Sequence, residues 1–236
     1  MTSPTVVLVH GAFADASSWR PVVARLRAAG TNARAVANPL RGLTHDGEYV
    51  ASLVSQIDGP VVLVGHSYGG PVITHAAAVA ANVTGLVYVA AFGLDTGMSA
   101  LSSVEGFPPA ELNTALVPAT YPDGEGSATE FTIDPAKFHP VFCADLPAGD
   151  AALMAASQRP VAELALAQPL AVEPAWKRVP SRFVVAAADH AIDPGAQRAA
   201  AARVGADTVE LDGASHAVAL SRPDEVAQVI SAAVGA

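Results

Sequence analysis

Residues 61–70 read VVLVGHSYGG, an apolar β-type run that leads directly into Gly65-His66-Ser67-Tyr68-Gly69. G-x-S-x-G between a strand and a helix is typical of a sharp turn that exposes a serine side chain. Side chains at positions 65 and 69 would collide with the neighbouring chain in such a turn, so glycine is favoured there. The free N–H groups at the start of the following helix would face developing negative charge. The segment predicts Ser67 as a nucleophile; the alternative is a glycine-rich turn whose serine only caps a helix.

The composition predicts a globular protein with one large core. The chain has 236 residues, of which 51% are hydrophobic and 15% charged. Its net charge of −9 disfavours nucleic acid and anionic membranes as partners, because both bind basic patches. Cys143 is the single cysteine, so an intrachain disulfide is excluded. The N-terminus lacks the features of a signal peptide and no apolar stretch is long enough to span a membrane, so we expect a cytoplasmic protein.

Short apolar runs alternate with longer helical patterns along most of the chain. This order predicts βα units on a mostly parallel sheet of about six strands, flanked by helices. The expected strands are residues 5–9, 32–37, 61–64, 85–91, 182–188 and 207–211. The expected helices are residues 17–29, 44–57, 69–80, 194–204 and 223–234.

The pattern changes between residues 93 and 180. This stretch contains most of the prolines and four of the seven phenylalanines, and it has no clear strand period. Only residues 150–157 and 160–167 are expected to form short helices. Insertions of this length are usually functional lids or caps. We therefore expect a single domain whose core is formed by residues 1–92 and 181–236, with a small helical cap at 93–180.

A nucleophilic serine needs a base within hydrogen-bond reach and a third group that orients the base. Functional groups of a parallel sheet gather at the carboxyl ends of its strands, which selects Asp189 and His216. Asp193 precedes a proline and is better interpreted as a helix cap, and Asp212 is too close in sequence to His216 to reach beneath its ring. We predict Ser67 as the nucleophile, His216 as the base and Asp189 as the orienting acid.

Acyl transfer also needs hydrogen-bond donors for the developing oxyanion. The N–H of Tyr68, directly after Ser67, is one candidate. The loop after the first strand should supply the second: Gly11 allows the backbone to approach, and the N–H of Ala12 is preferred, with Phe13 as the alternative. The other interpretation of this loop is a plain turn. No H-E-x-x-H motif or Cys/His cluster is present, so neither a metal nor a cofactor is expected.

Taken together, these segments resemble the α/β-hydrolase superfamily over essentially the whole chain. More narrowly, the chain is similar to the small cofactor-free group that includes plant methylesterases and hydroxynitrile lyases. The segments that carry this resemblance are Val9-His10-Gly11-Ala12, Gly65-His66-Ser67-Tyr68-Gly69-Gly70, Asp189 with Ile192-x-Pro194, and Ser215-His216-Ala217.

Two positions distinguish the branches of this group. Hydroxynitrile lyases carry threonine where this chain has Gly11, and lysine where it has Ala217, directly after the histidine. Their chemistry is therefore disfavoured, and Ser67 excludes the aspartate nucleophile of the haloalkane dehalogenases. The resemblance implies hydrolysis of a carboxylic ester through an acyl-enzyme on Ser67. Alternatives on the same fold are a lactonase, a carbon–carbon bond lyase and a non-catalytic small-ligand receptor.

The expected ligand is a small, largely apolar ester bound between the cap and the strand ends. The sequence leaves open the natural substrate, its enantiomer, and the choice between a monomer and a homodimer. The candidate lining residues are Gly11, Phe107, Phe131, Phe138, Phe142 and Trp176.

Overall fold

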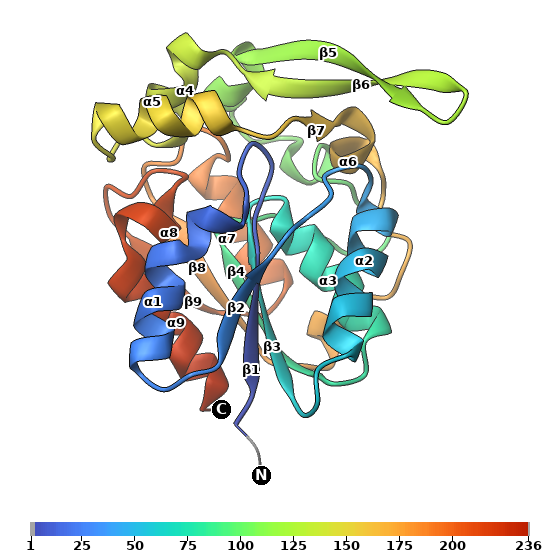
Figure 1. Ribbon diagram of the computed structural model, residues 1–236, viewed down its shortest axis with the longest axis vertical. Helices are drawn as coiled ribbons and strands as arrows, with labels where there is room; N and C mark the ends of the chain where they lie inside the picture. Colours follow the sequence, from blue (N-terminus) through green and yellow to red (C-terminus); the bar gives the residue numbers. More distant parts are fainter. Residues whose placement is uncertain (1–2, 236) are drawn as a thin grey trace.

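A six-stranded parallel sheet organises the computed structural model, which describes residues 3–235 (Figure 1). The strand order is β2-β1-β3-β4-β8-β9, and all neighbouring strands run parallel. The expected sheet of about six parallel strands is confirmed. The chain passes from β1 outward to β2 and then returns to the other side of β1, so a crevice for ligands is expected at the carboxyl ends of β1 and β3. The strands are β1 (Thr5–Val9), β2 (Ala33–Val36), β3 (Val61–His66), β4 (Val83–Val89), β8 (Ser181–Ala186) and β9 (Asp207–Leu211).

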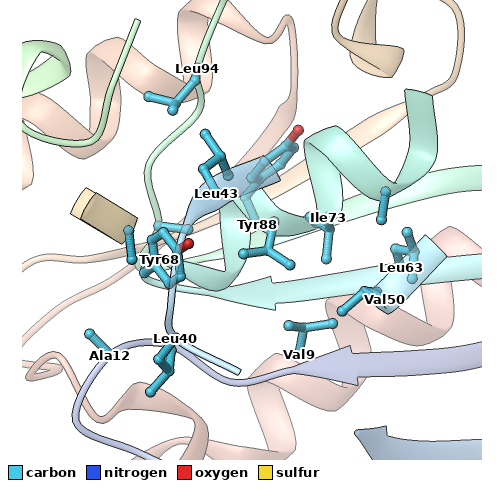
Figure 2. Packing of buried hydrophobic residues seen from close by; sticks show 14 of the residues in the cluster. Val9, Ala12, Leu40, Leu43, Val50, Leu63, Tyr68, Ile73, Tyr88 and Leu94 are labelled. Atoms are coloured by element: carbon cyan, nitrogen blue, oxygen red, sulfur yellow. The ribbon is translucent and has the colours of Figure 1, made fainter. Parts of the chain in front are cut away.

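Helices cover both faces of this sheet, as the expected βα units require. Side chains alternate along each strand, so Val7 and Val9 of β1 belong to one apolar cluster and Val6 and Leu8 to another. Part of the first cluster, including Val9, is drawn in Figure 2. Three helices pack on the face of the first cluster: α2 (Leu43–Ser55), α3 (Gly69–Val79) and α7 (Pro194–Arg203). Three others pack on the face of the second cluster: α1 (Arg20–Ala28), α8 (Val218–Ser221) and α9 (Pro223–Val234).

No helix of residues 3–235 combines the length and the apolar character needed to cross a bilayer.

The insertion between β4 and β8 lies over the carboxyl end of the sheet, at the top of Figure 1. Both short helices expected there are present, as α5 and α6, although α6 is preceded by a two-residue strand. The helices and strands of the insertion are β5 (Leu116–Asp123), β6 (Gly126–Ile133), α4 (Pro135–Phe142), α5 (Ala148–Ser157), β7 (Val161–Ala162) and α6 (Glu163–Ala167).

The insertion also contains an antiparallel sheet of order β5-β6-β7, which the sequence analysis missed. Pro118 and Pro122 fall within β5 and argue against a strand interior. They are tolerated because β5 is an edge strand, where a missing N–H costs no ladder hydrogen bond. The two-residue turn between β5 and β6 is Gly124-Glu125, with Gly124 at φ +56°. A glycine with positive φ at the first turn position is typical of a hairpin.

His75 of α3 is a buried histidine in the contact between α3 and α2. It is 1% exposed, and neither ring nitrogen has a hydrogen-bond partner among residues 3–235. Burial lowers its pKa below the usual value of about 6.5. Below pH 6.5 the unfolded chain therefore binds a proton that the folded chain does not, so stability falls as the pH falls through this range.

His75→Leu should therefore stabilise the protein by about 1 kcal/mol at pH 7, because it removes two buried polar atoms without partners. It should also make the loss of stability between pH 7 and pH 5 shallower than in the wild type. Urea denaturation across this pH range measures both effects. His45→Leu, at an exposed position of α2, is the matched control and should follow the wild-type pH dependence. A steeper loss of stability in His75→Leu would contradict the prediction.

Candidate active site

The residue at the tip of the turn between β3 and α3 is Ser67. Its φ of +54° is rare for a residue with a side chain and marks local backbone strain. The turn is held by the Ser67 N–H, which donates to the Val89 carbonyl at 3.1 Å. A Cβ at Gly65 would lie 2.4 Å from the Gly69 carbonyl oxygen, and one at Gly69 would lie 2.5 Å from the Val9 carbonyl oxygen. Only glycine fits at these two positions.

His216 and Asp189 form a buried pair at the ends of β9 and β8. The loop after β9 carries His216, whose Nδ1 lies 2.7 Å from Asp189 Oδ2. The histidine is 2% exposed and the aspartate 4%. Ser67 and His216 both line the same cavity, although the Ser67 Oγ makes no hydrogen bond to His216 in the described part of the chain. Such contacts often tighten only when substrate binds.

Both carboxylate oxygens of Asp189 are held by hydrogen bonds. Its Oδ1 accepts from the N–H groups of Ala191 at 2.7 Å and Ile192 at 2.9 Å. Its Oδ2 accepts from Gln197 Nε2 at 2.7 Å in addition to facing His216. Gln197 was missed by the sequence analysis, because nothing in the pattern of α7 marks this buried amide. These bonds orient the carboxylate toward the imidazole.

Neither of the two competing acids is hydrogen-bonded to His216 in the part of the chain that the structure describes. Asp193 caps α7, where its Oδ1 accepts from the N–H groups of Gly195 and Ala196 at 2.8 and 3.1 Å. Asp212 is exposed in the turn before His216. Asp189 is therefore the acid that faces the histidine.

Three backbone N–H groups are free beside Ser67. The N–H groups of Tyr68, Ala12 and Phe13 have no hydrogen-bond partner within residues 3–235, although all three residues are buried. Buried N–H groups normally have partners, and exceptions point to a functional role. Gly11 lies against Ser67, since a Cβ there would be 2.6 Å from Ser67 Cβ. The loop after β1 can thus offer donors close to the serine hydroxyl.

Two further histidines brace this arrangement. His10 Nδ1 donates to the Gly11 carbonyl at 2.9 Å, and its Nε2 accepts from the Asn38 N–H at 3.0 Å. Burial lowers the pKa of His10 to about 4, so the ring is neutral at pH 7. His66 Nε2 donates to the His216 carbonyl at 2.9 Å, and burial holds the pKa of His66 well below its usual value. Both neutral rings position backbone groups of the site.

The insertion holds the loop that carries His216. The Ala217 N–H donates to the Phe142 carbonyl at 3.0 Å, and the Phe142 ring packs against the His216 ring with centroids 4.9 Å apart. Asp145, just after α4, accepts hydrogen bonds from the hydroxyl and the N–H of Ser215. The histidine is therefore positioned by the insertion as well as by the sheet.

A cavity of about 300 Å³ opens between the insertion and the strand ends, beside Ser67 and His216. Its walls are mostly apolar, and its ionisable residues are Tyr68, Glu105, Asp193 and His216. Ala12, Tyr68, Phe13, Phe107 and Phe142 all line it. The sequence analysis missed several other wall residues because they lie in an irregular stretch or in short helices without a clear pattern: Phe92, Leu101, Val104, Leu112, Leu166 and Ile192.

Of the residues predicted to line the pocket, Gly11 and three aromatic residues are not among those that line this cavity. Phe138 is fully buried in the insertion and packs against Phe142 at 5.0 Å between centroids. Phe131 pairs in β6 with Val161 of β7. Trp176 donates its Nε1–H to the Leu94 carbonyl at 2.9 Å. The contacts given for these aromatic side chains lie within the insertion, where the three residues belong to or pack against the first apolar cluster. Residues 3–235 contain no group of three or more His, Cys, Asp or Glu side chains placed to bind a metal ion.

Comparison with solved structures finds the same fold throughout. The chain superposes on polyneuridine aldehyde esterase with a TM-score of 0.84, at 24% identity, over 98% of this chain and 99% of that one. It superposes on the pyrethroid hydrolase of Sphingobium faniae JZ-2 with a TM-score of 0.78, at 22% identity, over 100% and 98% of the two chains. The methylesterase MES16 of Arabidopsis gives 0.80, at 22% identity, over 98% and 99%. At these identities the likeness establishes the fold.

Sequence comparison supports the same relationship. The chain is 26% identical to the alpha/beta hydrolase nvfD of Aspergillus novofumigatus (strain IBT 16806), over all of this chain and 98% of that protein. The family model described as "Alpha/beta hydrolase family" matches residues 6–229, nearly the whole chain. The chain therefore belongs to the alpha/beta hydrolase family.

Proposed function

We propose that this protein is a serine hydrolase that cleaves small, largely apolar carboxylic esters through an acyl-enzyme on Ser67. The observation that carries the proposal is the meeting of three features at one cavity. These are the strained Ser67, the buried His216–Asp189 pair and unpaired backbone N–H groups. Together they match what acyl transfer to a serine requires. The structural relatives include an esterase and a methylesterase, which supports the same class of substrate.

In the proposed reaction, His216 Nε2 takes the proton of the Ser67 hydroxyl as Oγ attacks the ester carbonyl carbon. Asp189 holds the ring in the tautomer with a proton on Nδ1 and stabilises the imidazolium. The N–H groups of Ala12 and Tyr68 bind the oxyanion of the tetrahedral intermediate. The intermediate collapses as His216 protonates the leaving alcohol. Water, deprotonated by His216, then releases the carboxylic acid from Ser67.

Ser67→Ala should lower kcat/KM for a p-nitrophenyl ester by on the order of a thousandfold or more, because it removes the nucleophile. A fluorophosphonate should label the wild type on Ser67, as detected by mass spectrometry, and should leave the variant unlabelled. Full activity in Ser67→Ala would exclude the mechanism. A native protein that neither reacts with the probe nor cleaves esters, lactones or amides would indicate a ligand-binding role instead.

Gly11→Ala should lower kcat/KM by roughly a hundredfold, since its Cβ would lie 2.6 Å from Ser67 Cβ and displace the serine or the loop that offers the N–H donors. Gly149→Ala is the matched control, because a Cβ in that helix meets nothing within 4 Å. It should keep wild-type activity. Steady-state kinetics of both variants, with circular dichroism to verify folding, tests the close approach. Equal activities in the two variants would show that Gly11 does not need to be glycine.

A further inference from the structure

A second cavity, of about 410 Å³, lies between α5 and the loop that follows β1. Phe13 is the one residue that lines both this cavity and the one beside Ser67, among the residues that the structure describes. A small gap of about 10 Å³ shares Phe142 with the first cavity and Met154 with the second. Phe13 is therefore part of the wall between the two cavities, and Phe142 lies between the first cavity and the gap.

The Phe13 ring, which lines both cavities, is in edge-to-face contact with the Phe142 ring. The centroids of Phe13 and Phe142 are 6.5 Å apart, and their planes meet at 88°. Phe13 is 4% exposed and has a φ of +61°, a backbone conformation that is costly for an aromatic residue. Such strain persists only where the surrounding structure enforces it, and it is concentrated at functional positions. Phe13 also directly follows Ala12, so its ring stands next to the place proposed for the ester carbonyl.

The second cavity has a mixed wall that suits an uncharged chain better than a charged one. Leu146, Leu153, Met154 and Leu220 supply aliphatic surface, and the uncharged polar side chains are those of Ser17, Ser18, Ser157 and Gln158. The charged side chains on its wall are both carboxylates, Asp15 and Asp150, which disfavour an anionic group. Leu153 is 70% exposed, so the cavity reaches the surface beside it.

We propose that Phe13 is a specificity-determining residue. Its ring, which packs against Phe142, closes one end of the substrate cavity and so restricts the protein to short or compact esters. The second cavity is a subsite for an uncharged alkyl or aryl chain, and it becomes continuous with the catalytic cavity when the ring is removed. This inference rests on the proposed esterase function, and it adds the residue that limits substrate length.

The test compares kcat/KM for p-nitrophenyl decanoate with kcat/KM for p-nitrophenyl butyrate, each below its aggregation limit. Phe13→Gly should raise the decanoate-to-butyrate ratio by about tenfold or more, the gain for burying two or more additional methylene groups. Glycine accepts the positive φ without strain, so this variant should fold. Phe13→Ala should show the same change, whereas Phe13→Leu, which keeps a bulky apolar side chain, should stay close to the wild-type ratio.

Filling the second cavity distinguishes a subsite from a general loosening of the site. Met154→Trp in the Phe13→Gly background should bring the ratio back toward the wild-type value, because the indole occupies the new space. In the otherwise wild-type protein Met154→Trp should leave the ratio as it is, since Phe13 still separates the cavities. An unchanged ratio in both Phe13→Gly and Phe13→Ala would overturn the inference, and so would a gain that Met154→Trp does not reverse. A wild type without Ser67-dependent hydrolysis would instead overturn the proposed function.

Discussion

The close packing of β1 and its following loop against the turn at Gly65–Gly70 is the constraint on which the site depends. Gly69 lies under the Val9 carbonyl, and Gly11 lies against Ser67, at separations that leave no room for a Cβ. Because the two backbone segments approach so closely, a hydroxyl and several free N–H groups share one small space. The backbone strain at Ser67 follows from the same packing. Because the glycines carry no Cβ, the turn fits against β1 without displacing the sheet.

The insertion completes the site from the opposite side of the cavity. It contributes apolar walls, and it also fixes the histidine loop through the Phe142 carbonyl and the Asp145 carboxylate. Loops are usually the more mobile parts of a fold, so these contacts restrict the loop that carries His216. Changes inside the insertion are therefore expected to alter the position of His216 as well as the shape of the cavity, because α4 contacts both.

The parallel sheet and the placement of Ser67, Asp189 and His216 could be predicted because both follow from local rules. Parallel strands bring their carboxyl ends to one edge, wherever those strands occur in the sequence. The lining of the cavity could not be predicted in the same way. Phe138 and Phe142 lie on one helix, yet only Phe142 reaches the cavity, and the difference depends on how α4 packs. Gln197 supports Asp189 through a tertiary contact that leaves no periodic signal.

Three buried histidines meet around Ser67, and their partners assign them different roles. His10 and His66 are bonded to backbone groups, which cannot compensate a positive charge, so burial keeps both rings neutral. His216 alone faces a carboxylate, at 2.7 Å, which can compensate a positive charge on its ring. The electrostatic surroundings of each imidazole are thus set by its hydrogen-bond partner. Burial is common to all three, so the Asp189 carboxylate is what distinguishes His216 from the two histidines that brace backbone groups.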